Sequence, residues 1–309
     1  MRLFFGISGF LITFLLLQEE QQTGRISLKN FYIRRALKIW PIYFLFILIC
    51  FFLQCGNVIQ FNGENWRGLL TFTRNFYNAR TGYDSDWISG HFWSLSVEEQ
   101  FYLVWPLVFC LFRKMRSWFL GAAILVSIIF RTIQLFGVSR LHVFYLFELQ
   151  NTLNYLDCLG WGCLAALFFN EKLFENYSNF HKTISFIVGF GLLAIPYFIG
   201  IGKGLQAFGF IYLMVQSVRF HNWGVYKILN LKIIEKIGII SYSIYVWQQM
   251  VVWAWPHELS WLFWPVGVII VGYLSYHFIE KPFLGLKKNF CEPCAAVMPP
   301  DSPLKSTGN

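Results

Sequence analysis

Charged residues are scarce in this sequence. Asp, Glu, Lys and Arg make up 13% of its 309 residues, whereas 56% are hydrophobic and 20% are aromatic. Because an average soluble domain is about a quarter charged, this scarcity excludes an ordinary soluble fold, which could not bury so much apolar surface. The lysines and arginines are scattered between apolar blocks, so the net charge of +9 does not indicate a nucleic-acid-binding surface.

The sequence also lacks the cysteine patterns of disulfide frameworks and zinc sites. Most of the seven cysteines lie in or beside apolar blocks, where a small buried side chain is expected. Cys291 and Cys294 have the spacing of a zinc-binding pair. A structural zinc usually needs four ligands, and no second pair is present. We therefore predict no metal site.

The sequence does have long apolar blocks of about 15–20 residues. This length suits helices that cross ~30 Å of hydrocarbon. We predict an all-α, polytopic transmembrane bundle over residues 1–283, followed by a disordered cytoplasmic tail over 284–309. The predicted bundle has about nine spans: 3–17, 39–54, 93–112, 117–136, 153–170, 183–201, 204–219, 237–254 and 261–279.

The distribution of cations predicts which ends of the spans are cytoplasmic. Most lysines and arginines fall in one alternating set of loops and in the C-terminal tail, and such loops face the cytoplasm. We therefore predict a multi-pass protein of the cytoplasmic (inner) membrane with a cytoplasmic C-terminus. Nine spans would put Met1 outside, and the sequence lacks a cleavable signal. A further helix is therefore expected before Met1.

Three stretches are too particular for a generic membrane helix. They are residues 4–13 (FFGISGFLIT), residues 91–106 (HFWSLSVEEQFYLVWP), and the pair 238–247 (GIISYSIYVW) and 274–283 (LSYHFIEKPF). Together they resemble the acyltransferase family 3 membrane enzymes. Residues 157–165 also fit the family, although Tyr155 stands where an arginine is usual.

The resemblance implies a membrane-bound acyltransferase. Family members transfer an acyl group, usually acetyl, from cytoplasmic acyl-CoA to a hydroxyl of a surface carbohydrate. The expected partners are thus acyl-CoA (acetyl-CoA as co-substrate), an extracytoplasmic carbohydrate and the lipid bilayer, with no permanently bound cofactor and no nucleic acid. The complete family fold has ten spans, and its first helix carries a catalytic histidine. This chain begins after that helix, so the resemblance implies that it is inactive or needs that helix supplied separately.

Two residues of the central stretch are candidate catalytic groups. Glu98 lies one or two turns inside its span, where a carboxylate is costly and is expected to face a polar cavity or a partner. Its alternative role is to orient the helix through a neighbouring cation. His91 could act as a base on a sugar hydroxyl, or it could simply lie at the membrane interface. For Glu99 we predict a position in the outer headgroup layer.

Cations near the start of the second span are candidate ligands of the acyl donor. Arg34 and Arg35 offer planar donor forks that suit phosphate, and Lys38 stands where the family has a third arginine. The resemblance implies that this region holds the nucleotide end of CoA. Ordinary topology determinants are the alternative.

Trp93 and Ser8 are candidate substrate-binding residues. Trp93 could stack on a sugar ring, and the Ser8 hydroxyl could lie near the acyl group. Their alternatives are interfacial packing and close helix packing. Arg131 and Asp157 lie inside spans, where opposite charges normally pair or line a cavity.

A transporter or a non-catalytic membrane protein remains the alternative to an enzyme, because intramembrane charges also mark transport pathways. No inverted repeat is visible in the sequence.

Overall fold

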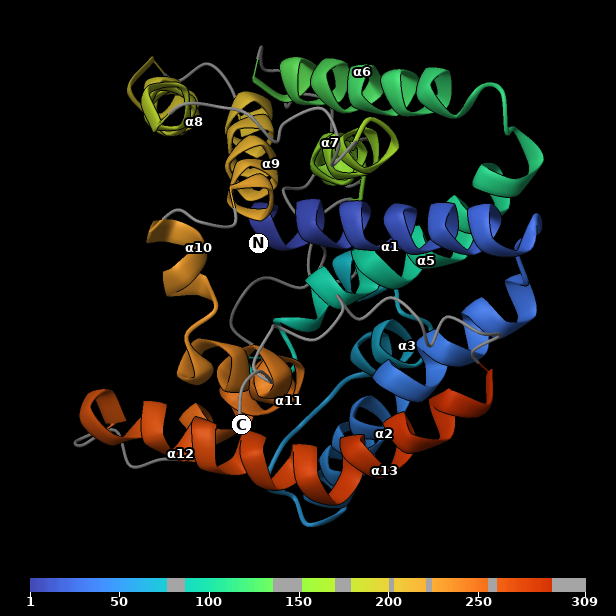
Figure 1. Ribbon diagram of the computed structural model, residues 1–309. Helices are drawn as coiled ribbons and strands as arrows, with labels where there is room; N and C mark the ends of the chain where they lie inside the picture. Colours follow the sequence, from blue (N-terminus) through green and yellow to red (C-terminus); the bar gives the residue numbers. More distant parts are fainter. Residues whose placement is uncertain are drawn as a thin grey trace, which may run out of the picture.

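The computed structural model describes residues 1–76, 87–135, 152–169, 179–199, 203–220, 224–254 and 260–290. All regular elements in these ranges are helical (Figure 1), which confirms the all-helical prediction. The α-helices are α1 (Arg2–Thr23), α2 (Leu28–Cys55), α3 (Gly63–Leu70), α5 (Phe92–Leu111), α6 (Arg116–Leu135), α7 (Leu156–Leu167), α8 (Asn179–Ile199), α9 (Lys203–Arg219), α10 (Gly224–Leu229), α11 (Lys232–Ala254), α12 (Ser260–Ser275) and α13 (Lys281–Leu286). Short 3₁₀ segments cover Thr152–Tyr155 and Lys287–Phe290, and a π-helical segment covers Tyr276–Glu280.

Each predicted span overlaps one of these helices, but nine spans are not confirmed. Within the described residues, three helices are long and apolar enough to cross a membrane: α1, α2 and the 116–133 part of α6. Some of the other helices are too short to cross a membrane. The described helix α7 has 12 residues, which at 1.5 Å per residue is about 18 Å against ~30 Å of hydrocarbon.

The turn between α1 and α2 is specified by local chemistry. Gly24 ends α1 with a φ of 72°, a left-handed conformation that glycine adopts without steric cost. Ser27 then caps α2, because its side chain accepts a hydrogen bond from the Asn30 N–H. The Ser27 N–H donates to Glu19 at 2.8 Å, so the end of one helix fixes the start of the next.

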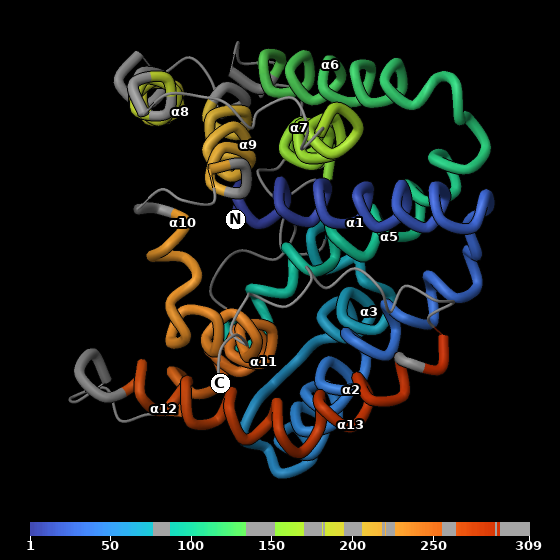
Figure 2. Tube along the Cα trace, in the orientation of Figure 1, coloured from blue at the N-terminus to red at the C-terminus, as the bar shows by residue number. Residues whose placement is uncertain are grey.

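The helices form two groups with α5 between them (Figures 1 and 2). The first group consists of α1 and α6 to α9, in which α1 packs along α7 and α7 contacts α6 and α9. The second group consists of α2 and α11 to α13. Aromatic side chains join α5 to this second group: the Phe46 ring lies 4.8 Å from Phe92 and 5.8 Å from Trp247.

The C-terminal boundary differs from the prediction. The chain stays helical from Lys281 to Phe290, so the predicted boundary at residue 283 falls inside α13. Arg34 of α2 stabilises this end by donating to the Phe290 carbonyl at 3.0 Å. Residues 291–309, including the Cys291 and Cys294 pair, lie outside the described residues.

Candidate functional site

Four buried polar residues follow one face of α5. They are His91 at its N-cap and Ser94, Glu98 and Tyr102 within the helix. Their spacing of three or four residues places them on one face, because an α-helix has 3.6 residues per turn. We call this row the polar track. Buried polar groups need partners, and the track obtains its partners from α1 and α11.

Glu98 is the best-connected member of the polar track. Its carboxyl group accepts a short hydrogen bond from the Ser8 hydroxyl of α1. The Tyr102 hydroxyl lies 3.2 Å from the same carboxyl group and 3.2 Å from the Ser8 oxygen. The structure therefore brings Ser8 and Glu98 together, although the sequence separates them by 90 residues. Gly6 and Gly9, on either side of Ser8, lie close to neighbouring helices, and the Ser8 hydroxyl itself faces α5.

Two cations of α2 lie next to this cluster. The Arg35 guanidinium stands over the Tyr102 ring at 5.3 Å from the centroid and over Phe31 at 5.8 Å. Arg35 interacts electrostatically with Glu98, and so does Lys38. Neither cation forms a hydrogen bond or a close ion pair with any of the described residues. Glu99 also attracts Arg35 and Glu280 also attracts Lys38, so the two cations are balanced through space rather than by a close contact.

Arg34 has a different environment from its neighbour. Its guanidinium forms an ion pair with Glu19 at 2.7 Å and donates to the Phe290 carbonyl. The three cations predicted to bind the acyl donor therefore lie in two different places. Arg35 and Lys38 lie beside Glu98, while Arg34 joins α1, α2 and the C-terminal segment.

His91 occupies a second polar cluster at the other end of the track. Its ring contacts the Gln249 side chain of α11, and its carbonyl accepts a hydrogen bond from the Tyr245 hydroxyl at 2.7 Å. His91 and Glu98 share a face of α5 but are seven residues apart, which is about 10 Å along the helix axis. The structure does not bring these two candidate catalytic residues into contact.

Trp93 lies within an aromatic cluster. Its ring centroid is 5.2 Å from that of Tyr155 and 6.1 Å from that of Phe5, and the side chain is partly buried. Tyr155, which replaces the usual arginine, therefore contributes an apolar contact here. A sugar ring would have to bind Trp93 beside these two rings.

Glu99 is partly buried in the structure, on the side of α5 that faces α2. One of its carboxylate oxygens is buried and lacks a hydrogen-bond partner among the described residues. Arg35 interacts electrostatically with Glu99 as well as with Glu98. The charge on α2 gives a physical reason for this inward position, because an opposite charge offsets part of the cost of burying a carboxylate.

Arg131 and Asp157 form an ion pair in the first group of helices. The Asp157 side chain is fully buried and the Arg131 side chain is 13% exposed. Ser127 also donates to Asp157, at 3.3 Å. This ion pair joins α6 to α7 and is not part of the polar track. The sequence left open whether the two charges pair or line a cavity, and the structure shows that they pair.

Sequence reasoning missed several partners of the site. Tyr102 could have been found, because it follows Glu98 by one helical turn. Gln249 and Tyr245 carry no local signal, since their role depends on how α11 is placed against α5. No cluster of metal-binding side chains occurs within the described ranges.

A family model for the acyltransferase domain matches residues 1–284, which is nearly the whole chain. The chain belongs to acyltransferase family 3. The polar track, the paired Ser8 and Glu98, and the cations of α2 all lie within the matched acyltransferase domain. Apolar helices and this family membership together indicate a membrane protein.

Curated relatives of this family 3 chain carry matching names. The O-acetyltransferase OatA of Staphylococcus aureus strain NCTC 8325 / PS 47 is 27% identical over 325 aligned residues, which cover 93% of this chain and 52% of the relative. OatA of strain COL matches with the same identity and coverage. The chain spans about half the length of the curated relatives that it matches. No solved structure matches it significantly.

Proposed function

We propose that this protein transfers an acyl group, most simply acetyl, from acyl-CoA to a hydroxyl of an extracytoplasmic carbohydrate. Membership of the acyltransferase family supports acyl transfer, and the names of the relatives support an oxygen acceptor. The observation that carries the proposal is the Ser8–Glu98–Tyr102 cluster beside Arg35 and Lys38, two cations without a close ion pair among the described residues.

The reaction needs a proton acceptor and a site for an anionic donor. The acceptor hydroxyl attacks the thioester carbonyl, so that a C–O bond forms, the C–S bond breaks and the thiolate leaves as CoA thiol with the hydroxyl proton. His91 takes that proton as the hydroxyl attacks and returns it to the leaving sulfur. Glu98, held by Ser8 and Tyr102, orients the reacting groups in the middle of α5.

Arg35 and Lys38 hold the phosphate groups of the donor in this proposal. A guanidinium binds phosphate oxygens through a fork of donors, and a lysine adds a point charge. Arg34 contributes indirectly, because its ion pair with Glu19 fixes the start of α2 from which the other two cations project. In this proposal Trp93 stacks on the acceptor sugar, and the Ser8 hydroxyl lies near the acyl group.

The protein works in the cytoplasmic membrane in this proposal, with its C-terminus inside. The donor cations lie in the first half of α2, near its cation-rich end, and His91 lies at the N-terminal end of α5. An acyl group could therefore enter from the cytoplasm and leave to an acceptor on the other face.

The Glu98→Gln variant tests the proposal. In membrane vesicles supplied with acetyl-CoA labelled in the acetyl group, we expect it to lose transfer to a carbohydrate hydroxyl by about 100-fold or more, because the amide cannot accept both hydrogen bonds as the carboxylate does. Glu235→Gln, which removes an exposed acid of α11, is the matched control and should keep full activity. Equal activity of both variants would contradict the proposal. Absence of any transfer by the parent protein would favour a non-catalytic role.

A further inference from the structure

Gln249 is placed to control the chemical state of His91. The Gln249 side-chain oxygen lies 3.1 Å from the backbone N–H of His91 and 2.7 Å from Nδ1 of its ring. The two nitrogens thus share one acceptor atom on α11. Nothing in the family resemblance or in the names of the relatives assigns a role to Gln249.

The backbone contact fixes which way the Gln249 amide points. A backbone N–H can only donate, so the atom that faces it must be the amide oxygen and not the amide nitrogen. The same oxygen cannot donate to the ring, and Nδ1 must therefore carry the proton. In the neutral ring the other nitrogen, Nε2, is then an acceptor with a free lone pair.

The surroundings of Nε2 leave this lone pair unused. His91 is 4% exposed, and Nε2 is buried without a hydrogen-bond partner. The ring packs between Phe46, Phe92 and Tyr245, whose centroids lie 6.2, 4.1 and 5.0 Å away. The backbone of Tyr245 and Val246 also lies beside the His91 ring.

A second contact holds the backbone of His91 in place. Tyr245, one turn before Gln249 on α11, donates its hydroxyl proton to the His91 carbonyl at 2.7 Å. The Ser94 hydroxyl lies 2.9 Å from the Tyr245 oxygen and completes the arrangement. Two residues of one helix thus fix both the backbone and the ring of His91.

We propose that Gln249 is a positioning residue that keeps His91 as the Nδ1–H tautomer, so that Nε2 can accept the proton of the attacking hydroxyl. This inference deepens the proposed function and rests on it for the identity of the proton donor. The tautomer itself does not depend on the substrate. It can therefore be measured whether or not transfer is observed.

The first experiment measures the tautomer directly. The full chain is labelled with ¹⁵N-histidine in detergent micelles, and the His91 signals are assigned by their loss in His91→Ala. We expect long-range ¹H–¹⁵N correlations of the Nδ1–H form in the parent protein. Gln249→Met, which keeps the length but removes the acceptor, should lose that form, and Gln249→Glu should keep it. An Nε2–H ring in the parent, or an unchanged ring in Gln249→Met, would overturn the inference.

The second experiment separates positioning from general structural support. We expect Gln249→Met to lower kcat about tenfold or more, to leave KM for acetyl-CoA unchanged, and to be rescued by Gln249→Glu. In a His91→Ala background, the same change should have no further effect, because Gln249 acts through His91. An equal loss in both backgrounds would show a structural role instead. If the parent protein transfers no acyl group, the proposed function fails while the tautomer measurement still decides the role of Gln249.

Discussion

Arg34 and Arg35 are adjacent in the sequence but have different surroundings. One is bound in an ion pair with Glu19, while the other stands over an aromatic ring and lacks an acceptor among the described residues. A cation inside a helical bundle that lacks a close counter-charge is costly, and a bound anion would reduce that cost. The two arginines should therefore affect different properties of the protein.

Replacing these arginines in turn tests this division. We expect Arg35→Gln to raise KM for acetyl-CoA about tenfold or more, since a charge-assisted contact with the donor is worth roughly 1.5–3 kcal/mol. Arg34→Gln should leave KM near its parent value and lower the free energy of unfolding by about 1–3 kcal/mol, because Glu19 loses its ion-pair partner and the Phe290 carbonyl loses a donor. Initial rates and thermal unfolding in detergent measure the two effects. A larger KM change for Arg34→Gln than for Arg35→Gln would contradict the assignment.

The ion pair of Arg131 and Asp157 leads to a prediction about the stability of the protein, also at the scale of single residues. Asp157→Asn leaves a largely buried guanidinium without its counter-charge, so we expect a loss of about 3–5 kcal/mol in the free energy of unfolding. The double variant Arg131→Met with Asp157→Leu removes both charges and should recover most of that loss. Unfolding in denaturant measures both proteins. A double variant as unstable as the single one would show that the charges act separately.

At the scale of helices, α1 and α7 pack closely because the glycines at their crossing have no Cβ atom. A Cβ added to Gly9 would lie 2.3 Å from the Leu159 carbonyl oxygen, and one added to Gly162 would lie 2.1 Å from the Gly6 carbonyl oxygen. These neighbours are backbone atoms, which cannot rotate away. Small residues at such crossings allow helices in membranes to approach closely. The same crossing holds Ser8 in reach of Glu98.

Adding one methyl group to α7 should therefore disturb the site. We expect Gly162→Ala to lower the free energy of unfolding by about 1–3 kcal/mol, the usual cost of overpacking, and to lower acyl transfer by shifting α1. Gly121→Ala in α6 is the matched control. Its added Cβ would meet nothing within 4 Å, so stability should stay constant or rise slightly because alanine favours helix. Equal effects of the two substitutions would exclude a specific α1–α7 contact.

The helices could be predicted from the sequence, whereas the contacts between them could not. Long apolar blocks indicate helices, because a segment inside a bilayer has to satisfy its backbone hydrogen bonds internally. The family motifs pointed separately to Ser8 and Glu98, and the fold brings them together. The contact of Gln249 with His91 depends on the register of α11 against α5, which no local pattern encodes. The interaction of Glu99 with Arg35 likewise joins two helices, so no pattern within α5 indicates it.

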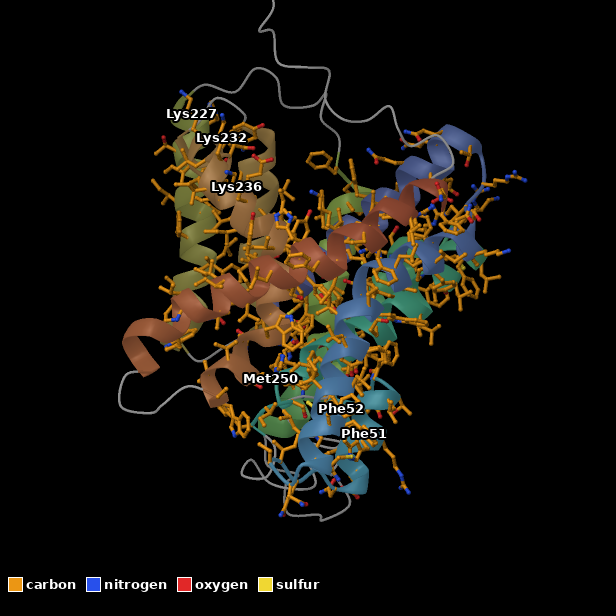
Figure 3. The ribbon with its side chains drawn as sticks, turned by 90° about the horizontal axis from the view of Figure 1, so that it is seen from below. Phe51, Phe52, Lys227, Lys232, Lys236 and Met250 are labelled. Atoms are coloured by element: carbon orange, nitrogen blue, oxygen red, sulfur yellow. The ribbon has the colours of Figure 1, made fainter. Side chains whose placement is uncertain are left out.

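At the scale of the whole molecule, α2 and α11 run in the same direction through the second group of helices. Tyr242 of α11 donates to the Ile39 carbonyl of α2, and further along the two helices Trp247 packs on Phe46. Figure 3 shows the consequence: Lys227, Lys232 and Lys236 gather at one end of the molecule, and Phe51, Phe52 and Met250 lie at the other. The positive-inside rule then predicts that the lysine end faces the cytoplasm.

Labelling of single introduced cysteines tests this orientation. Lys236 is exposed near the start of α11, and Asn57 is exposed just after α2. In cells whose parent protein has Cys55, Cys291 and Cys294 replaced by Ser, we expect a membrane-impermeant maleimide to label Asn57→Cys in intact cells. Lys236→Cys should react only after permeabilisation. The parent without an added cysteine gives the background signal. Labelling of Lys236→Cys in intact cells would place the donor cations of α2 on the outer face, and a cytoplasmic acyl-CoA could not then reach them.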